Sequence, residues 1–99
     1  MSRLDREALI DRLSQLLPAA ADPDGVSDLI GERGRINVAA GPADIGTAID
    51  RLKPLEGYRW LGINRADLFQ ASPKTIGTKV GIIDESGKVL KAADLPRKK

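Results

Sequence analysis

The sequence predicts a small α+β domain in which three N-terminal and central helices precede a small antiparallel sheet or hairpin. Apolar residues recur at helical spacing in the first half of the chain, most clearly over residues 45–52. In the second half, β-branched runs flank a Ser86-Gly87 pair that is typical of a tight turn. The chain has 99 residues, close to the usual size of one domain.

The composition excludes several kinds of chemistry. The chain has no cysteine, which excludes disulfides and thiolate catalysis, and no histidine, which removes the commonest general base and metal ligand. Residues 1–13 carry charges throughout, so they predict neither a signal peptide nor a membrane span. We therefore expect a cytoplasmic protein with no metal, no cofactor and no membrane partner.

Charge is distributed unevenly along the chain. Residues 1–56 hold 7 basic and 10 acidic side chains, whereas residues 57–99 hold 9 basic and 4 acidic ones. Such an asymmetry can orient a protein on a charged partner. Arg97, Lys98 and Lys99 supply much of the positive charge, and we expect residues 97–99 to be a disordered, solvated tail. The single globular domain then covers residues 1–96.

Two helices are expected before the central one. A leucine-rich stripe predicts the first over residues 3–17, with Ser2 as its cap. Asp22 and Pro23 suit the cap and first position of a second helix, which Gly34 would end. Residues 35–38 alternate between polar and apolar, which predicts a short strand.

The central helix is predicted over residues 42–53. Its first residue, Pro42, lacks an N–H that would have no partner at this position. Ile49 lies in the middle of the apolar stripe, so we expect its side chain to be almost fully buried. A strand follows over residues 58–63.

The remaining elements are short. A capping-box pattern predicts one helical turn over residues 65–70, and Pro73 is expected to end it. Strands over residues 78–84 and 88–92 are predicted to form a hairpin, with Gly87 supplying the positive φ that a tight turn needs.

This order of elements is similar to that of a winged helix, with residues 42–53 as the recognition helix and 79–90 as the wing. Asp44 and Asp50 would face the DNA, and their carboxylates would repel its phosphates. Sequence-specific DNA readout is therefore disfavoured. Non-specific nucleic-acid binding stays open as the alternative, because phosphate contacts need only spaced cations; the candidates are Lys74, Lys79 and Lys88.

Catalysis would have to depend on Asp, Glu, Lys, Tyr or Ser alone. No pair of carboxylates stands in an apolar stretch that would tune its pKa, and Asp84 and Glu85 fall at the tip of the predicted hairpin. Residues 72–79 lack the paired glycines of a nucleotide-binding loop. We therefore expect the protein not to be an enzyme.

The residues favoured for binding are Tyr58, Arg59, Trp60 and Arg65. Tyrosine, tryptophan and arginine dominate the energetic centres of protein interfaces. Trp60 has two interpretations at this point, as interface anchor or as core, whereas Arg59 is expected at the surface. The sequence thus predicts a small adaptor or binding module whose partner is another protein, with nucleic acid as the alternative.

Overall fold

The computed structural model describes residues 3–95. Its helices are α1 (Arg6–Leu16), α2 (Pro42–Leu52) and α3 (Leu68–Thr75), and a short 3-10 helix, η1 (Arg65–Asp67), leads into α3. Its strands are β1 (Ala19–Ala21), β2 (Leu29–Gly31), β3 (Gly34–Ala39), β4 (Arg59–Ile63), β5 (Gly81–Ile83) and β6 (Val89–Lys91). The predicted basic tail, residues 97–99, lies outside the described residues.

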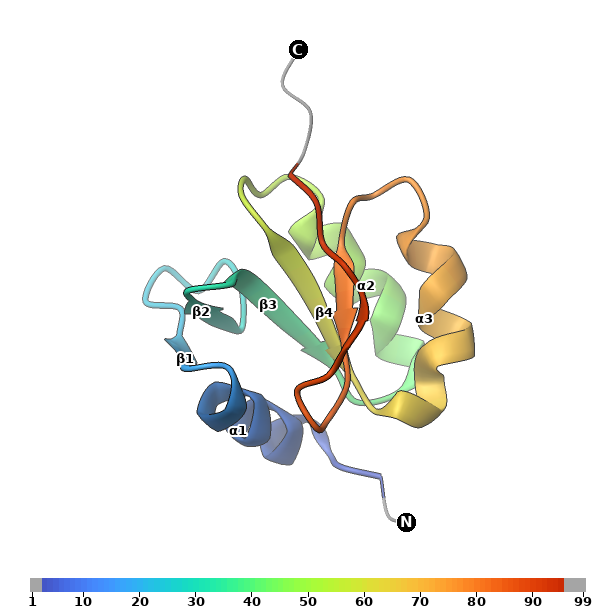
Figure 1. The fold of residues 1–99 in the computed structure, drawn as a ribbon, viewed down its shortest axis with the longest axis horizontal. Helices are drawn as coiled ribbons and strands as arrows, with labels where there is room; N and C mark the ends of the chain where they lie inside the picture. Colours follow the sequence, from blue (N-terminus) through green and yellow to red (C-terminus); the bar gives the residue numbers. More distant parts are fainter. Residues whose placement is uncertain (1–2, 96–99) are drawn as a thin grey trace.

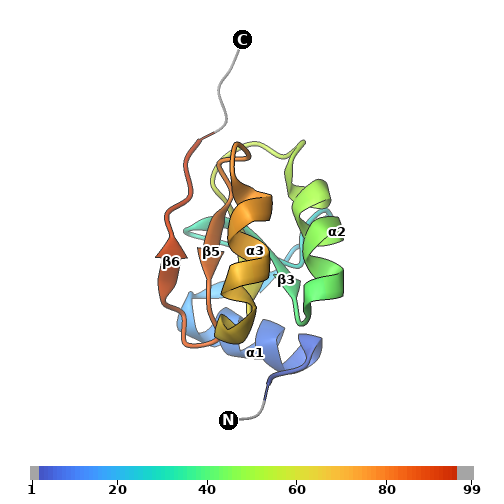
Figure 2. The ribbon, with the colours of Figure 1, turned by 90° about the vertical axis from the view of Figure 1, so that its right-hand side faces the viewer.

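The six strands form one mixed sheet whose spatial order, β1 to β6, is the order of the chain (Figure 1). Strands β1, β2 and β3 are antiparallel neighbours, β3, β4 and β5 are parallel, and β6 returns antiparallel to β5. Helix α1 packs on one face. Helices α2 and α3 lie side by side on the other (Figure 2).

The expected fold class, three helices followed by a small antiparallel sheet or hairpin, is wrong. The helices alternate with strands, and the sheet is mixed and has six strands, rather than being a small antiparallel sheet or hairpin after the helices. The winged-helix interpretation fails with it, because α2 is a crossover between the parallel strands β3 and β4, and its apolar side is buried on the sheet.

The error begins at residues 22–34, where the second helix was expected. Asp22 does not cap a helix. Its carboxylate accepts the N–H groups of Asp24, at 2.9 Å, and Ser27, at 3.0 Å, and forms an ion pair with Arg35. These bonds close a loop, after which β2 pairs with β3 through a turn at residues 32–33. The helical spacing of apolar residues here was coincidental.

The loop around Asp22 should make folding stability depend on acid pH. The hydrogen bond from the Asp24 N–H, followed by those from Ser27 and the charge of Arg35, lowers the pKa of the Asp22 carboxyl. A lowered pKa in the folded state stabilises the protein above the unfolded value of about 3.9, and this contribution disappears as the pH falls through the folded pKa. We expect Asp22→Asn to lower the melting temperature most at neutral pH.

Thermal melts from neutral pH downwards test this expectation, with the exposed Asp50→Asn as control. The difference in melting temperature between wild type and Asp22→Asn should narrow as the pH falls below about 3.9. A difference that is constant with pH would show that the Asp22 charge contributes nothing.

Two apolar cores lie on opposite faces of the sheet. One joins α2 and α3 to β3, β4 and β5, and the other packs α1 against the remaining faces of β2, β3 and β4. The predicted burial of Ile49 is confirmed, with 2% of its surface exposed. All five residues of β4 are buried, because helices cover both of its faces.

Several local predictions are confirmed. The first helix, the strand at residues 35–38, the central helix and the strand at residues 58–63 are α1, β3, α2 and β4. Helix α1 is capped by Asp5, whose carboxylate accepts the Ala8 N–H at 2.8 Å; the predicted cap, Ser2, lies outside the described residues. The hairpin of β5 and β6 exists, and Gly87 has φ +81°.

Helix α3 is longer than expected. The helical turn predicted over residues 65–70 begins as η1 and continues as α3 through Pro73 to Thr75. Pro73 removes the N–H that would pair with the carbonyl of Phe69. Burial of Leu68, Ala71 and Thr75 against the sheet and α2 outweighs this loss.

Candidate functional site

Trp60 is a core residue. Its side chain is 8% exposed, packs in the α1 core, and donates a hydrogen bond from Nε1 to the Arg33 carbonyl at 2.8 Å. A Cβ at Gly81 would lie 2.5 Å from the indole ring, so the glycine provides room for it. Of its two interpretations, the core one applies.

Arg59 is buried, not exposed as expected. Only 2% of it is accessible, and its guanidinium donates to the carbonyls of Leu52, Lys53 and Thr78. It therefore caps the carboxyl end of α2, where the helix dipole favours a cation. Burial lowers the pKa of Arg59, and among residues 3–95 its Nε has no hydrogen-bond partner.

Tyr58 and Arg65 are both at the surface but lie at opposite ends of β4. Tyr58 is 45% exposed, and the Arg65 side chain is 61% exposed. The five extended residues of β4 and Asn64 lie between them, and β4 alone spans about 17 Å. The four residues predicted as one binding face therefore do not form one surface.

The largest exposed apolar side chains lie on α3 instead. Phe69, the only phenylalanine in the chain, is 87% exposed, and Ile76, the residue after the helix, is 72% exposed. Pro73 is also exposed and shares their side of the helix at i+4, which makes an apolar strip. We call Phe69, Pro73 and Ile76 the α3 strip.

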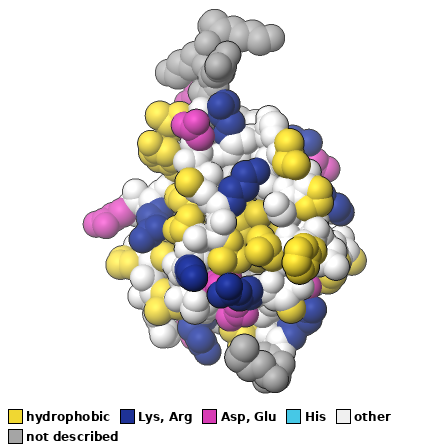
Figure 3. All heavy atoms as spheres, turned by 45° about the vertical axis from the view of Figure 1, so that its right-hand side comes forward, with side chains coloured by type: hydrophobic (Ala, Val, Ile, Leu, Met, Phe, Trp, Pro, Cys, Tyr) yellow, Lys and Arg dark blue, Asp and Glu magenta, His cyan; other side chains and the backbone are white. Residues whose placement is uncertain are grey.

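Within the segment that carries the α3 strip, the exposed charges have one sign. Among residues 65–83, the charged side chains that reach the surface are Arg65, Lys74 and Lys79. The one acid in this segment, Asp67, is 1% exposed. Figure 3 shows hydrophobic side chains gathered on this side of the molecule, with Lys and Arg side chains around them. The α3 strip is thus an apolar surface with basic side chains beside it in the chain, of which Lys79 and Arg65 also have acidic neighbours, Asp94 and Glu85.

The lysines predicted to contact phosphate do not form one patch. Lys79 precedes β5 and lies 3.8 Å from Asp94. Lys88 lies beyond the other end of β5, where its backbone carbonyl accepts the Asp84 N–H, about 17 Å away from Lys79 along the strand. Lys74 is on α3 and reaches towards Gly46 of α2. This spacing disfavours a single bound phosphate.

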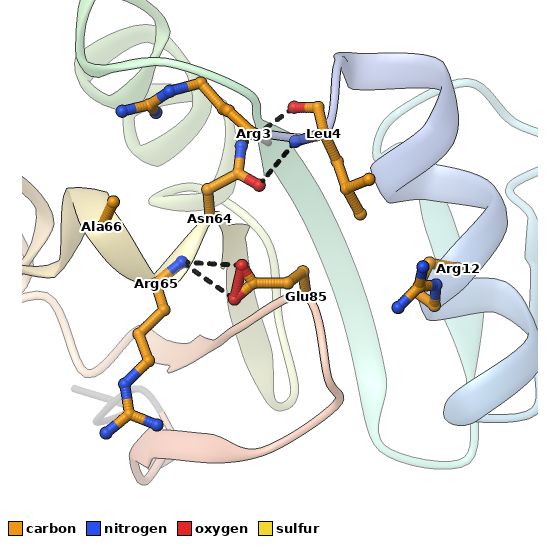
Figure 4. Close-up of a pocket in the computed structure, with 7 residues that line it drawn as sticks. All are labelled: Arg3, Leu4, Arg12, Asn64, Arg65, Ala66 and Glu85. Carbon is orange, nitrogen blue, oxygen red and sulfur yellow. Dashed lines mark hydrogen bonds between the residues drawn. The ribbon is translucent and has the colours of Figure 1, made fainter. Parts of the chain in front are cut away.

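A pocket of about 620 Å³ adjoins the α3 strip, at the carboxyl ends of β4 and β5. It is lined by Arg3, Leu4, Arg12, Asn64, Arg65, Ala66 and Glu85 (Figure 4). In open parallel sheets, ligands bind outside the carboxyl ends of the strands. The buried amide of Asn64 exchanges two hydrogen bonds with the backbone of Leu4, which fixes the N-terminal segment as one wall.

Each cation of the pocket except Arg12 has an acidic neighbour. Arg3 pairs with Asp67, and this hydrogen bond together with the charge of Asp67 raises the pKa of Arg3. The Arg65 guanidinium lies 3.9 Å from Asp84, while its backbone N–H donates to both oxygens of Glu85, at 3.0 and 3.2 Å. The pocket can therefore offer polar contacts to a partner, mainly through Arg12 and Arg65, but its charges nearly balance.

Other kinds of site have little support within the described part of the chain. Among residues 3–95, no three acidic side chains lie close enough together to hold a metal ion. No helix in this range is both long and apolar enough to cross a membrane. Comparisons with protein-family models, with curated proteins and with solved structures find no match to this chain.

Phe69 and Ile76 were not predicted as surface residues from the sequence. Their signal was present, because residues 66, 69, 73 and 76 repeat apolar side chains at helical spacing, opposite the half-buried residue 68 and the buried residues 71 and 75. Because the helix was predicted to end at Pro73, this second apolar side was not recognised.

Proposed function

We propose that this protein is a non-catalytic binding module, an adaptor whose partner is a protein that docks on the α3 strip. One observation carries the proposal: the chain's only phenylalanine is 87% exposed, beside Ile76 at 72%. Aromatic anchors at the surface are typical of interface centres. The absence of cysteine supports a cytoplasmic place of action.

The charges around the strip indicate the chemistry of the partner. Arg65, Lys74 and Lys79 lie close to the apolar residues in the chain, and no exposed acid lies among residues 65–83, whereas Asp94 lies 3.8 Å from Lys79. Complementary charges steer association and select among partners. The partner segment should therefore present apolar side chains flanked by aspartate or glutamate.

The test uses a photo-crosslinking amino acid at exposed Gln70, next to the strip, expressed in the native host. The crosslinked protein is then purified and titrated calorimetrically against wild type and Phe69→Ser with Ile76→Ser. We expect the double variant to fold normally, because both side chains are exposed. Its affinity should fall about 30-fold or more, the equivalent of about 2 kcal/mol for an interface hot spot.

Tyr58→Ser is the matched control, since it removes an exposed aromatic side chain at the far end of β4. It should bind the crosslinked protein like wild type. Equal affinity for all three proteins would contradict the proposal. Crosslinking to nucleic acid, with binding that weakens steeply with salt and survives the Phe69 and Ile76 changes, would favour the nucleic-acid alternative.

A further inference from the structure

The two edges of the sheet are β1 and β6, and neither has a second neighbour among the described residues. Edge strands expose unpaired N–H and C=O groups, and natural proteins usually protect them with lysines, bulges or covering segments. The two edges of this sheet differ in their protection and in their charge.

Within residues 3–95, strand β1 has no such protection. It consists of three alanines, of which Ala20 and Ala21 are exposed, and it pairs with β2 without a bulge. A groove of about 370 Å³ runs beside it, under α1, with Ile10 and Leu29 among its lining residues. This edge can accept another strand, and the groove can accept an apolar side chain from it.

The surroundings of β1 are acidic. Glu7 and Asp11 line the groove, Asp24 lies in the loop after β1, and Glu32 lies in the next turn. Arg33 is the one exposed base in the segment from Ala19 to Gly34. The nearby cations Arg6 and Arg35 are held by Asp28 and Asp22.

The surroundings of β6 are basic. Lys88 precedes the strand, and Lys91 is its last residue, with its Nζ donating to Thr75 Oγ1 at 2.9 Å. Lys79 lies next to the carboxyl end of the strand, where it pairs with Asp94. The register shifts between Ile82 and Ile83, which is a further form of edge protection. Val89, 37% exposed, pairs with Ile83 of the α1 core, so its side chain points to the α1 face.

We propose that β6 of one copy pairs with β1 of a second copy, head to tail. Lysines oppose pairing of two β6 edges, and acids oppose pairing of two β1 edges, so the unlike edges are left as the favoured pair. The sheet keeps the order of the chain, and the sequence's charge asymmetry therefore becomes an acidic edge and a basic edge.

The topology fits this arrangement. Three antiparallel steps separate β1 from β6, so the two strands run in opposite directions within one copy. A second copy placed beside the first without inversion would thus pair antiparallel, with the α1 faces on the same side. Val89 then points towards the groove under α1 of the neighbour. Because such a contact repeats, it gives a ring or an open chain of copies.

The experiment is sedimentation of the full chain from about 10 µM to about 1 mM, at about 20 mM and about 500 mM salt. Strands of three residues make a small contact, so association should be weak. At low salt the average mass should rise with concentration above the 10.6 kDa of one chain, and high salt should reverse the rise.

Two charge-reversed double variants test whether the contact joins edges of unlike charge. Glu7→Lys with Asp11→Lys makes both edges basic, and Lys88→Glu with Lys91→Glu makes both acidic, so each variant alone should stay monomeric. Their equal mixture should associate again, because every junction then joins unlike charges. Circular-dichroism melts confirm that each variant is folded.

Three results would overturn the proposal. They are a wild type that stays monomeric at the highest concentration, a mixture that does not associate, and association that Phe69→Ser abolishes. The last would assign the contact between copies to the α3 strip. Failure of edge pairing leaves binding of another protein to the α3 strip unaffected, so the two proposals are tested separately.

Discussion

Arg59→Glu is expected to unfold the protein. The substitution would place a carboxylate against the carbonyls of Leu52, Lys53 and Thr78, which now accept hydrogen bonds from the guanidinium at 3.4, 3.2 and 2.7 Å. Leaving a buried charge without its partners costs about 3–5 kcal/mol. That is most of the stability of a small domain near the lower end of the usual range of about 5–15 kcal/mol.

Urea unfolding monitored by circular dichroism measures this effect. The matched control is Arg65→Glu, the same charge reversal on a side chain that is 61% exposed, which should change stability by less than about 1 kcal/mol. If Arg59→Glu remained as stable as Arg65→Glu, the guanidinium would not be buried in solution. Binding studies should therefore change Arg65 and leave Arg59 intact.

Gly34→Ala is expected to have the second-largest effect. Gly34 has φ +116°, a conformation that costs a residue with a side chain about 1–3 kcal/mol. An added Cβ would also lie 2.2 Å from the Tyr58 carbonyl oxygen, which accepts the N–H of Arg35 where β3 and β4 begin to pair. The backbone must move to relieve this clash, so the parallel pairing weakens as well.

Gly57→Ala separates the conformational cost of a positive φ from the cost of the clash with Tyr58. Gly57 has φ +78°, and nothing lies within 4 Å of its added Cβ, so only the conformational cost of about 1–2 kcal/mol applies. Urea titrations of both variants should place Gly34→Ala clearly below Gly57→Ala in stability. Equal losses would show that the contact with Tyr58 adds nothing to the conformational cost.

Elements with strong periodicity could be predicted from the sequence. Residues 42–53 and 58–63 carry dense apolar patterns, and α2 and β4 are found there. Strand β1 could not be predicted, because three alanines favour a helix by intrinsic propensity and give no strand signal. The prediction of a helix over residues 22–34 was wrong because the Asp22 carboxylate accepts backbone N–H groups within a loop, and the same kind of bond would cap a helix.

The candidate site was predictable only in part. Arg65 is exposed as expected, but Arg59 and Trp60 are buried because helices cover both faces of β4, a feature that depends on the topology of the sheet. Large side chains on both faces of β4 indicate that the strand is buried on both sides. The same pattern also fits a strand with an interface on one face, so the sequence does not distinguish the two. The exposure of Phe69 follows from the continuation of α3 through Pro73, against the local preference of proline.

The agreement between strand order and chain order also bears on how the protein folds. Among residues 3–95, every strand pairs only with its neighbours in chain order, and no pairing joins residues more than 24 positions apart, as in Arg35 with Arg59. These separations are smaller than those of sheets assembled from the two ends of a chain, and lower contact order favours faster folding. During synthesis, β1, β2 and β3 can pair while the rest is still being made, and each later strand finds its edge already formed.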